Sequence, residues 1–125
     1  MQTQPLILLV DDDVQIQEIF STRLKDAGFQ VLQARNGEEG LKLAKQEKPD
    51  LILLDVMMPI MDGAKMLIEM KNDAEIKDIH VIFLTALDDR PESIKFAKES
   101  GAVDFVNKDI DFPVLLGKIK SILQI

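Results

Sequence analysis

The chain of 125 residues contains no cysteine, tryptophan or tyrosine, and it has a single histidine. Without cysteine there is no disulfide, no thiolate metal site and no cysteine nucleophile, a composition that suits a reducing compartment such as the cytoplasm. Basic residues are also scarce, at 15 against 22 acidic ones, so the formal net charge is −7. Because nucleic acids and anionic membranes attract basic surfaces, this balance argues against direct binding to either.

Long hydrophobic runs are missing too. The apolar run LILLV near the N-terminus ends at three aspartates, and no basic leader precedes it. It therefore predicts neither a signal peptide nor a membrane span. No repeat, low-complexity segment or linker-like stretch divides the sequence, and its length suits one hydrophobic core. We expect a single domain over residues 1–125, with no second domain in this chain.

Short apolar runs alternate with segments of helical spacing along the whole sequence. The runs are LILLV (6–10), FQVLQA (29–34), LILLD (51–55), HVIFL (80–84) and VDFV (103–106). Several are continuously apolar, which is typical of strands covered on both faces in a parallel sheet. Five such βα units predict an α/β fold, a flavodoxin-like doubly wound five-stranded parallel sheet in the order 2-1-3-4-5 with five helices.

Local signals place the ends of the five helices. Gly28 is suited to end the first, Asn36-Gly37 and Asp62-Gly63 to begin the second and third, Pro91 and Gly101 to bound the fourth, and Asp111 with Pro113 to begin the fifth. Apolar residues recur at helical spacing within these segments, as in Ile16, Phe20 and Leu24. Each helix is thus expected to lay one apolar stripe on the sheet.

Chemistry-bearing residues follow the strands at their carboxyl ends, where ligands bind in such sheets. They are Asp11, Asp12 and Asp13 after the first run, Asp55 after the third, Thr85 after the fourth and Lys108 after the fifth. Strands one and three are neighbours in the predicted order, so Asp11, Asp12 and Asp55 are expected to converge. Carboxylates about 4 Å apart repel by roughly 4 kcal/mol at an effective dielectric near 20, which calls for a cation.

The type of cation and the chemistry follow from the ligands. An open set of oxygen ligands favours Mg²⁺, or Mn²⁺, over zinc. A carboxylate beside a divalent ion, a lysine and a hydroxyl is suited to receive a phosphoryl group and form an aspartyl phosphate. Each residue also has an ordinary alternative, since aspartates at strand exits often cap helices and a loop lysine is usually solvated.

Over its whole length, the sequence resembles the receiver domains of two-component response regulators. The matching stretches are VDDD, LLDVMMPIMDG, LTA and GAVDFVNK, of which the second is the most specific. The resemblance implies a stand-alone, chemotaxis-regulator-like receiver without an output domain. It implies a phosphoryl-accepting switch rather than a conventional turnover enzyme. The donor would be a histidine kinase or phosphotransfer protein, the output a downstream protein target, and the state a monomer or a phosphorylation-dependent dimer.

Carried over by position, Asp55 resembles the phosphoacceptor and Thr85 and Lys108 the hydroxyl and ammonium that contact the phosphoryl group. For the Mg²⁺ the resemblance implies Asp12, Asp11 through metal-bound water, Asp55 and the backbone carbonyl of Met57. Thr85 and Phe105 resemble the switch pair, which reshapes the surface of helix 4, strand 5 and helix 5. Met57 and Leu87 stand at the positions that line the approach of hydrolytic water.

The sequence departs from the family pattern at two positions. Asp109 follows Lys108 where the family usually has proline, so this loop is expected to take its own path. Phe105 replaces the common tyrosine and cannot donate a hydroxyl hydrogen bond. The first departure motivates an alternative, a phosphorylation-independent binding module of the same fold.

Two further alternatives rest on other chemistry. An aspartyl-phosphate phosphatase is suggested by the spacing of Asp11 and Asp13, but the chain leaves no room for a cap domain. A flavin-binding protein of this fold would meet three aspartates where it needs a phosphate loop.

Overall fold

The computed structural model describes residues 4–125 except 57, 59–60, 86–94 and 96–98. Its five parallel strands form one sheet in the order β2-β1-β3-β4-β5. They are β1 (Leu6–Val10), β2 (Gln30–Ala34), β3 (Leu51–Leu54), β4 (His80–Thr85) and β5 (Asp104–Asn107). The predicted parallel sheet and its strand order are confirmed.

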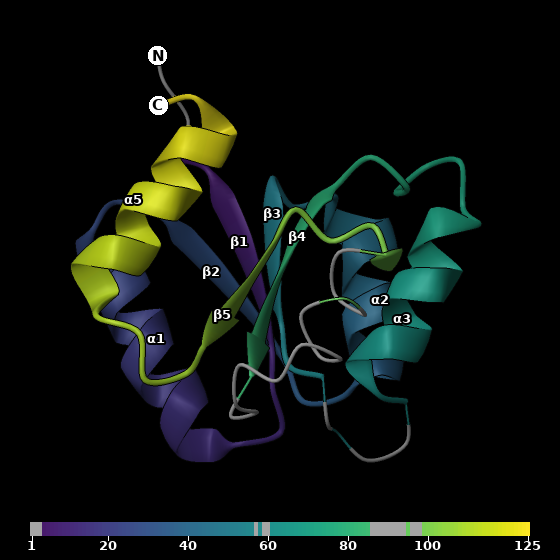
Figure 1. Ribbon diagram of the computed structural model, residues 1–125, viewed down its shortest axis with the longest axis horizontal. Helices are drawn as coiled ribbons and strands as arrows, with labels where there is room; N and C mark the ends of the chain where they lie inside the picture. The colour runs from purple at the N-terminus through teal and green to yellow at the C-terminus, as the bar shows by residue number, and fades with distance from the viewer. Residues whose placement is uncertain (1–3, 57, 59–60, 86–94, 96–98) are drawn as a thin grey trace.

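Helices cover both faces of the sheet (Figure 1). They are α1 (Val14–Asp26), α2 (Gly37–Glu47), α3 (Gly63–Lys71) and α5 (Phe112–Leu123). Helices α1 and α5 lie on one face, and α2 and α3 on the other. The helix predicted between Pro91 and Gly101 falls largely outside the described residues. Within the described part of the chain, no helix combines the length and the hydropathy needed to cross a bilayer.

The strands are apolar on both sides because each side faces helices. In β1, Leu8 and Val10 pack in a cluster with Met66 of α3, whereas Ile7 and Leu9 pack with Leu24 of α1 and its neighbours on the opposite face. All four β1 residues have an exposed fraction of 0%. Burying one such side chain is worth about 1.5–3 kcal/mol, so every strand contributes to two half-cores at once.

Side-chain caps begin three of the helices at the carboxyl edge of the sheet. The capping carboxylates and amide accept backbone N–H groups at 2.8–2.9 Å in the pairs Gln15 to Asp13, Glu39 to Asn36 and Lys65 to Asp62. Such caps satisfy donors that the first helical turn leaves unpaired. Asp111 occupies the expected cap position of α5, but its side chain makes no capping hydrogen bond. The fixed φ of Pro113 supports the start of that helix instead.

Candidate functional site

The ends of β1 and β3 bring two aspartates side by side. The Asp11 N–H donates to the carbonyl of Ala34 at 3.0 Å, and the Asp55 N–H donates to the carbonyl of Val10 at 2.9 Å. These bonds extend the parallel ladders by one residue beyond the strands, in which Val10 pairs with Leu54. Asp11 and Asp55 therefore stand at adjacent positions of the sheet, both directly after a strand.

Asp12 completes a cluster of three carboxylates. One oxygen from each of Asp11, Asp12 and Asp55 lies within 4.8 Å of the others. Asp11 and Asp55 are buried, with exposed fractions of 0% and 4%, while Asp12 is exposed. At this separation each ionised pair repels by roughly 3–4 kcal/mol at an effective dielectric near 20. The cluster is costly unless cations lie close to it.

Lys108 supplies one such cation from the chain that follows β5. Its Nζ lies 2.8 Å from Oδ2 of Asp11 and 3.4 Å from Oδ2 of Asp55, and its side chain is 14% exposed. Burial lowers the pKa of Lys108, but the contact with Asp11 and the charges of Asp55 and Asp11 raise it by more, so the net shift is upward from 10.5. The lysine is thus protonated at neutral pH and neutralises one of the three formal negative charges.

A turn centred on Asn107 positions Lys108 without a proline. The Asn107 side-chain oxygen accepts the N–H of Asp109 at 2.8 Å. The Asn107 carbonyl accepts the N–H of Ile110 at 3.0 Å, and the Lys108 N–H donates to the carbonyl of Thr85 at 2.8 Å. Proline at position 109 would lack the N–H that Asn107 binds. The departure from the family pattern therefore comes with a hydrogen bond of its own.

Two other residues singled out in the sequence, Thr85 and Phe105, lie on the neighbouring strands β4 and β5. Thr85 is the last residue of β4, is 1% exposed and pairs in register with Asn107. Phe105 lies opposite Phe83 in β5 and is half-buried against the cluster of α2 and α3. Met57 and Leu87 fall outside the described residues.

Asp13, which also follows β1, has a structural role. Its N–H donates to Oδ1 of Asp11 at 2.9 Å. Its own carboxylate caps α1.

A glycine allows the start of α3 to pack against the backbone of Asp55. A Cβ at Gly63 would collide with the backbone carbonyl oxygen of Asp55. The Gly63 N–H donates to the carbonyl of Val56 at 2.9 Å, which joins the start of α3 to the chain directly after Asp55. The backbone of Asp55 is thus packed directly against the start of α3, so the position of this carboxylate depends on the absence of a side chain at residue 63.

Sequence reasoning missed Gln17 and Asn107. Gln17 is a buried amide in α1 whose Nε2 reaches the carbonyls of Leu9, Asp11 and Ala34. A polar residue within a helix gives no signal of such contacts, because they join segments distant in sequence. Asn107 directly precedes Lys108. An asparagine side chain often accepts the backbone N–H two residues further on, which is a recognised turn signal.

The cluster fits a divalent cation. Oδ2 of Asp11 is buried and, apart from Lys108, has no partner among the described residues. Three carboxylates beside one ammonium leave two formal negative charges uncompensated, which matches the charge of such an ion. Oxygen-only ligands with one exposed member are the type that Mg²⁺ accepts, since it keeps several of its waters.

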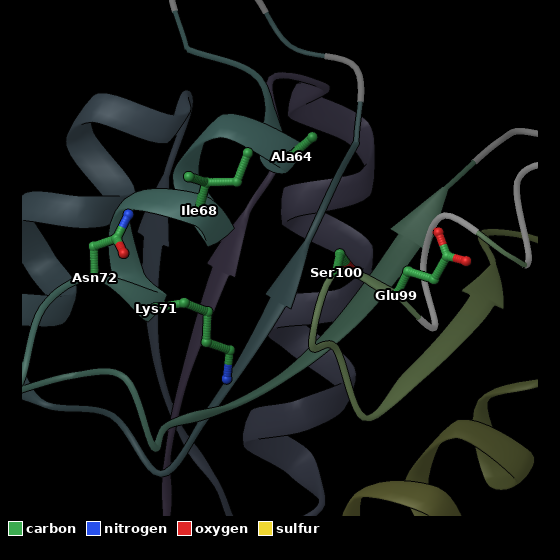
Figure 2. A pocket seen from close by; sticks show the side chains of 6 residues that line it. All are labelled: Ala64, Ile68, Lys71, Asn72, Glu99 and Ser100. Carbon is green, nitrogen blue, oxygen red and sulfur yellow. The ribbon is translucent and has the colours of Figure 1, made fainter.

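A hollow with a different lining is shown in Figure 2. It has a volume of about 350 Å³ and lies between α3 and the segment before β5. Ala64, Ile68 and Asn72 follow one another by single turns along one wall, with Glu99 and Ser100 opposite. Its lining includes none of Asp11, Asp12, Asp55, Thr85 and Lys108.

Comparisons with known proteins agree with this fold. The family model described as "Response regulator receiver domain" matches residues 7–120. The protein PilH of Pseudomonas aeruginosa is 38% identical over 117 residues, which cover 94% of this chain and 96% of PilH. The DNA-binding dual master transcriptional regulator RpaA of Synechocystis is 38% identical over 120 residues, which cover 96% of this chain and 49% of RpaA. The chain thus spans about half the length of RpaA.

Solved structures give the same result. The receiver domain of a signal transduction histidine kinase from Syntrophus aciditrophicus matches with a TM-score of 0.87 at 35% identity, covering 96% of this chain and 90% of that one. The chemotaxis protein CheY4 of Vibrio cholerae matches with a TM-score of 0.88 at 29% identity, covering 96% and 99%. With a family model over nearly its whole length, this chain belongs to the response regulator receiver domains, the signalling switches of two-component systems.

Proposed function

We propose that this protein is a Mg²⁺-dependent phosphoryl-accepting switch in which Asp55 is the acceptor. A histidine kinase or phosphotransfer protein is the donor, in the cytoplasm. The observation that carries the proposal is the pairing of buried Asp55 with Lys108 beside Asp11 and Asp12. A buried carboxylate next to a fixed ammonium is shielded from bulk water and oriented for attack.

In the proposed reaction a carboxylate oxygen of Asp55 attacks the phosphorus of a phosphohistidine. The P–N bond breaks, and the leaving imidazole takes up a proton. Lys108, held by the Asn107 turn, keeps its ammonium within reach of Asp55 and donates to a phosphoryl oxygen. The Thr85 hydroxyl donates to another. These positive and polar groups offset the charge that gathers on the phosphoryl oxygens during transfer.

Asp11, Asp12 and Asp55 would hold the Mg²⁺, with the Met57 carbonyl as a further ligand expected from the resemblance. When bound, the ion supplies charge neutralisation for the phosphoryl oxygens. Release of phosphate returns the carboxylate through attack by water at phosphorus. This makes the protein a switch that is reset rather than a conventional enzyme.

The output is a shift between two conformations. Thr85 and Phe105 reposition after phosphorylation and change the face that includes β5 and α5, which a downstream protein target, or a second copy, recognises. A nearly complete swing from one state to the other requires about 5.5 kcal/mol of differential stabilisation. New contacts from the dianion to Lys108 and Thr85 contribute to that difference.

A phosphorylation-independent binding module was the main alternative, and it rested on the missing proline after Lys108. Lys108 nevertheless reaches both Asp11 and Asp55. This pairing favours the switch, because a module that never handles phosphate has no need to bury a lysine against two carboxylates.

The test is the intact mass of the protein after incubation with acetyl phosphate, with and without Mg²⁺. We expect one phosphoryl adduct that requires Mg²⁺ and is released by hydroxylamine, as an acyl phosphate is. Asp55→Asn should give no adduct. Asp13→Asn is the matched control, because asparagine still caps α1 and the adduct should remain. An adduct on Asp55→Asn, or none on the wild type with either acetyl phosphate or a phosphorylated histidine donor, would contradict the proposal.

A further inference from the structure

Gln17 is a buried amide that the proposed reaction does not use. Its exposed fraction is 5%. Its Nε2 lies 2.7 Å from the carbonyl oxygen of Ala34, 3.0 Å from that of Asp11 and 3.1 Å from that of Leu9. The three carbonyls lie near the carboxyl ends of β1 and β2: Leu9 is within β1, Asp11 follows it directly, and Ala34 is the last residue of β2. One side chain of α1 thus provides the donor for backbone groups of two strands.

The other half of the same amide is left without a partner. Oε1 of Gln17 is buried and has no hydrogen-bond partner among the described residues. A buried, unpaired acceptor disfavours folding. An apolar side chain of equal length would avoid that penalty. The contribution of this glutamine therefore lies in what its Nε2 holds.

What Nε2 holds is the peptide group between Asp11 and Asp12. The carbonyl of that peptide accepts from Gln17, and the preceding N–H, that of Asp11, is bound to Ala34. On the far side, the Asp13 N–H donates to the Asp11 carboxylate, and Asp13 caps the helix that carries Gln17. Hydrogen bonds thus link Asp11 to Asp13 and Asp13 to the start of α1, and Gln17 of the same helix binds the Asp11 carbonyl.

We propose that Gln17 is a positioning residue for the carboxylate cluster. By fixing the plane of the Asp11–Asp12 peptide, its amide sets the directions in which both carboxylates leave the backbone, and so the spacing that a divalent cation meets. The inference rests on the proposed function, since the cation is the Mg²⁺ of that proposal. Outer residues that orient metal ligands in this way typically change metal affinity by 10–100-fold when replaced.

The test compares two variants on the same helix. Gln17→Met keeps the length of the side chain and removes the donor. Ser21→Ala is the matched control, because Ser21 lies one turn further along α1, is 4% exposed and accepts from Gln33 of β2 at 2.6 Å without touching the site. Titration calorimetry gives the Mg²⁺ affinity of each folded protein. We expect the Kd for Mg²⁺ to be about tenfold higher for Gln17→Met and unchanged for Ser21→Ala.

A second measurement keeps the inference separate from the proposed function. Amide hydrogen exchange in the metal-free protein should be faster at Asp12 and Asp13 in Gln17→Met than in Ser21→Ala. If the wild type binds no Mg²⁺, the proposed function fails, and the exchange rates alone decide whether Gln17 holds the peptide. An unchanged Kd in Gln17→Met, equal losses in both variants, or equal exchange would overturn the inference. If Gln17→Met does not fold, Gln17→Asn keeps the amide but withdraws it from the carbonyls, with the same expectations.

Discussion

Lys108 partly neutralises two buried carboxylates, and its worth depends on their staying charged. Removing one partner of a buried ion pair leaves the other charge uncompensated, at a cost of about 3–5 kcal/mol. A surface pair is worth far less, in the range of about 0–1 kcal/mol. The chain offers both kinds, since the pair of Lys118 with Asp104 at 2.9 Å is considerably more exposed than that of Lys108.

We therefore expect Lys108→Met to lower the free energy of unfolding by about 3 kcal/mol in metal-free buffer at neutral pH. Because folding raises the pKa of Lys108, the stabilisation is fully present below the unfolded value near 10.5 and is lost as the pH rises through the folded value. Urea unfolding of wild type and variant across this pH range measures the difference. Lys118→Met is the control, and an equal loss in both variants would contradict the prediction.

Some of these residue contacts could be predicted from the sequence and others could not. Asp11, Asp12 and Asp55 could be expected to converge because each follows a strand of an apolar, recognisable run. The contacts of Gln17 could not, since they join a helix to carbonyls of segments distant in sequence. The turn at Asn107 carries a local signal to which no role was assigned. Asp111 shows the reverse case, a residue at the expected cap position whose side chain makes no capping bond.

Among the elements, the start of α3 lies directly against the backbone that follows β3. A methyl group on Gly63 would meet the carbonyl oxygen of Asp55, whereas one on Gly117, in the middle of α5, would meet nothing within 4 Å. The two glycines thus present the same substitution in opposite surroundings.

Gly63→Ala should lower the free energy of unfolding by more than about 1 kcal/mol, because the backbone must move to relieve overpacking. Gly117→Ala should raise it by about 0.5–1 kcal/mol, since alanine favours a helix interior over glycine. Thermal and urea unfolding measure both. A stabilised Gly63→Ala protein would show that the contact between residue 63 and the Asp55 carbonyl has room to adjust.

The loop from β5 to α5 contains a backbone N–H, that of Asp109, which the Asn107 side chain binds. Asp109→Pro removes the N–H that Asn107 binds, and proline destabilises where the replaced N–H was hydrogen-bonded. We expect a loss of about 1 kcal/mol in the free energy of unfolding. Asp109→Ala keeps the N–H and should lie within about 0.5 kcal/mol of wild type. Equal effects of the two variants in urea unfolding would show that the hydrogen bond from the Asp109 N–H to Asn107 does not stabilise the loop that positions Lys108.

Element limits followed the sequence where an apolar run met a clear end signal. The predicted first strand, residues 6–10, agrees with β1, and the order of the sheet followed from the alternation of runs. The second apolar run begins at Phe29, whereas β2 begins at Gln30. Phe29 is not part of the strand because its N–H donates to the carbonyl of Leu24 and completes the end of α1. Thr85 extends β4 by one residue because the ladder to Asn107 continues through it.

For the whole molecule, a cation held at the proposed site would add to the stability of the folded state. A ligand that binds the folded state alone stabilises it by about 2.7 kcal/mol at 100 times its Kd. Wild-type protein should therefore gain unfolding free energy with Mg²⁺ concentration along this relation. Asp12→Asn should show a much smaller gain, while its metal-free stability is not lowered, because an exposed like charge has been removed. Calorimetric melting at several Mg²⁺ concentrations tests this, and parallel gains in both proteins would contradict a site at these carboxylates.

The sheet that carries the site also divides the interior in two. Side chains next to each other in β1, such as Leu8 and Leu9, belong to two separate clusters of the described residues, one on each face of the sheet. Substitutions on opposite faces should therefore combine with little epistasis, whereas those on one face must compensate each other. A lineage of such chains can revise the packing under α1 and α5 while that under α2 and α3 stays as it was.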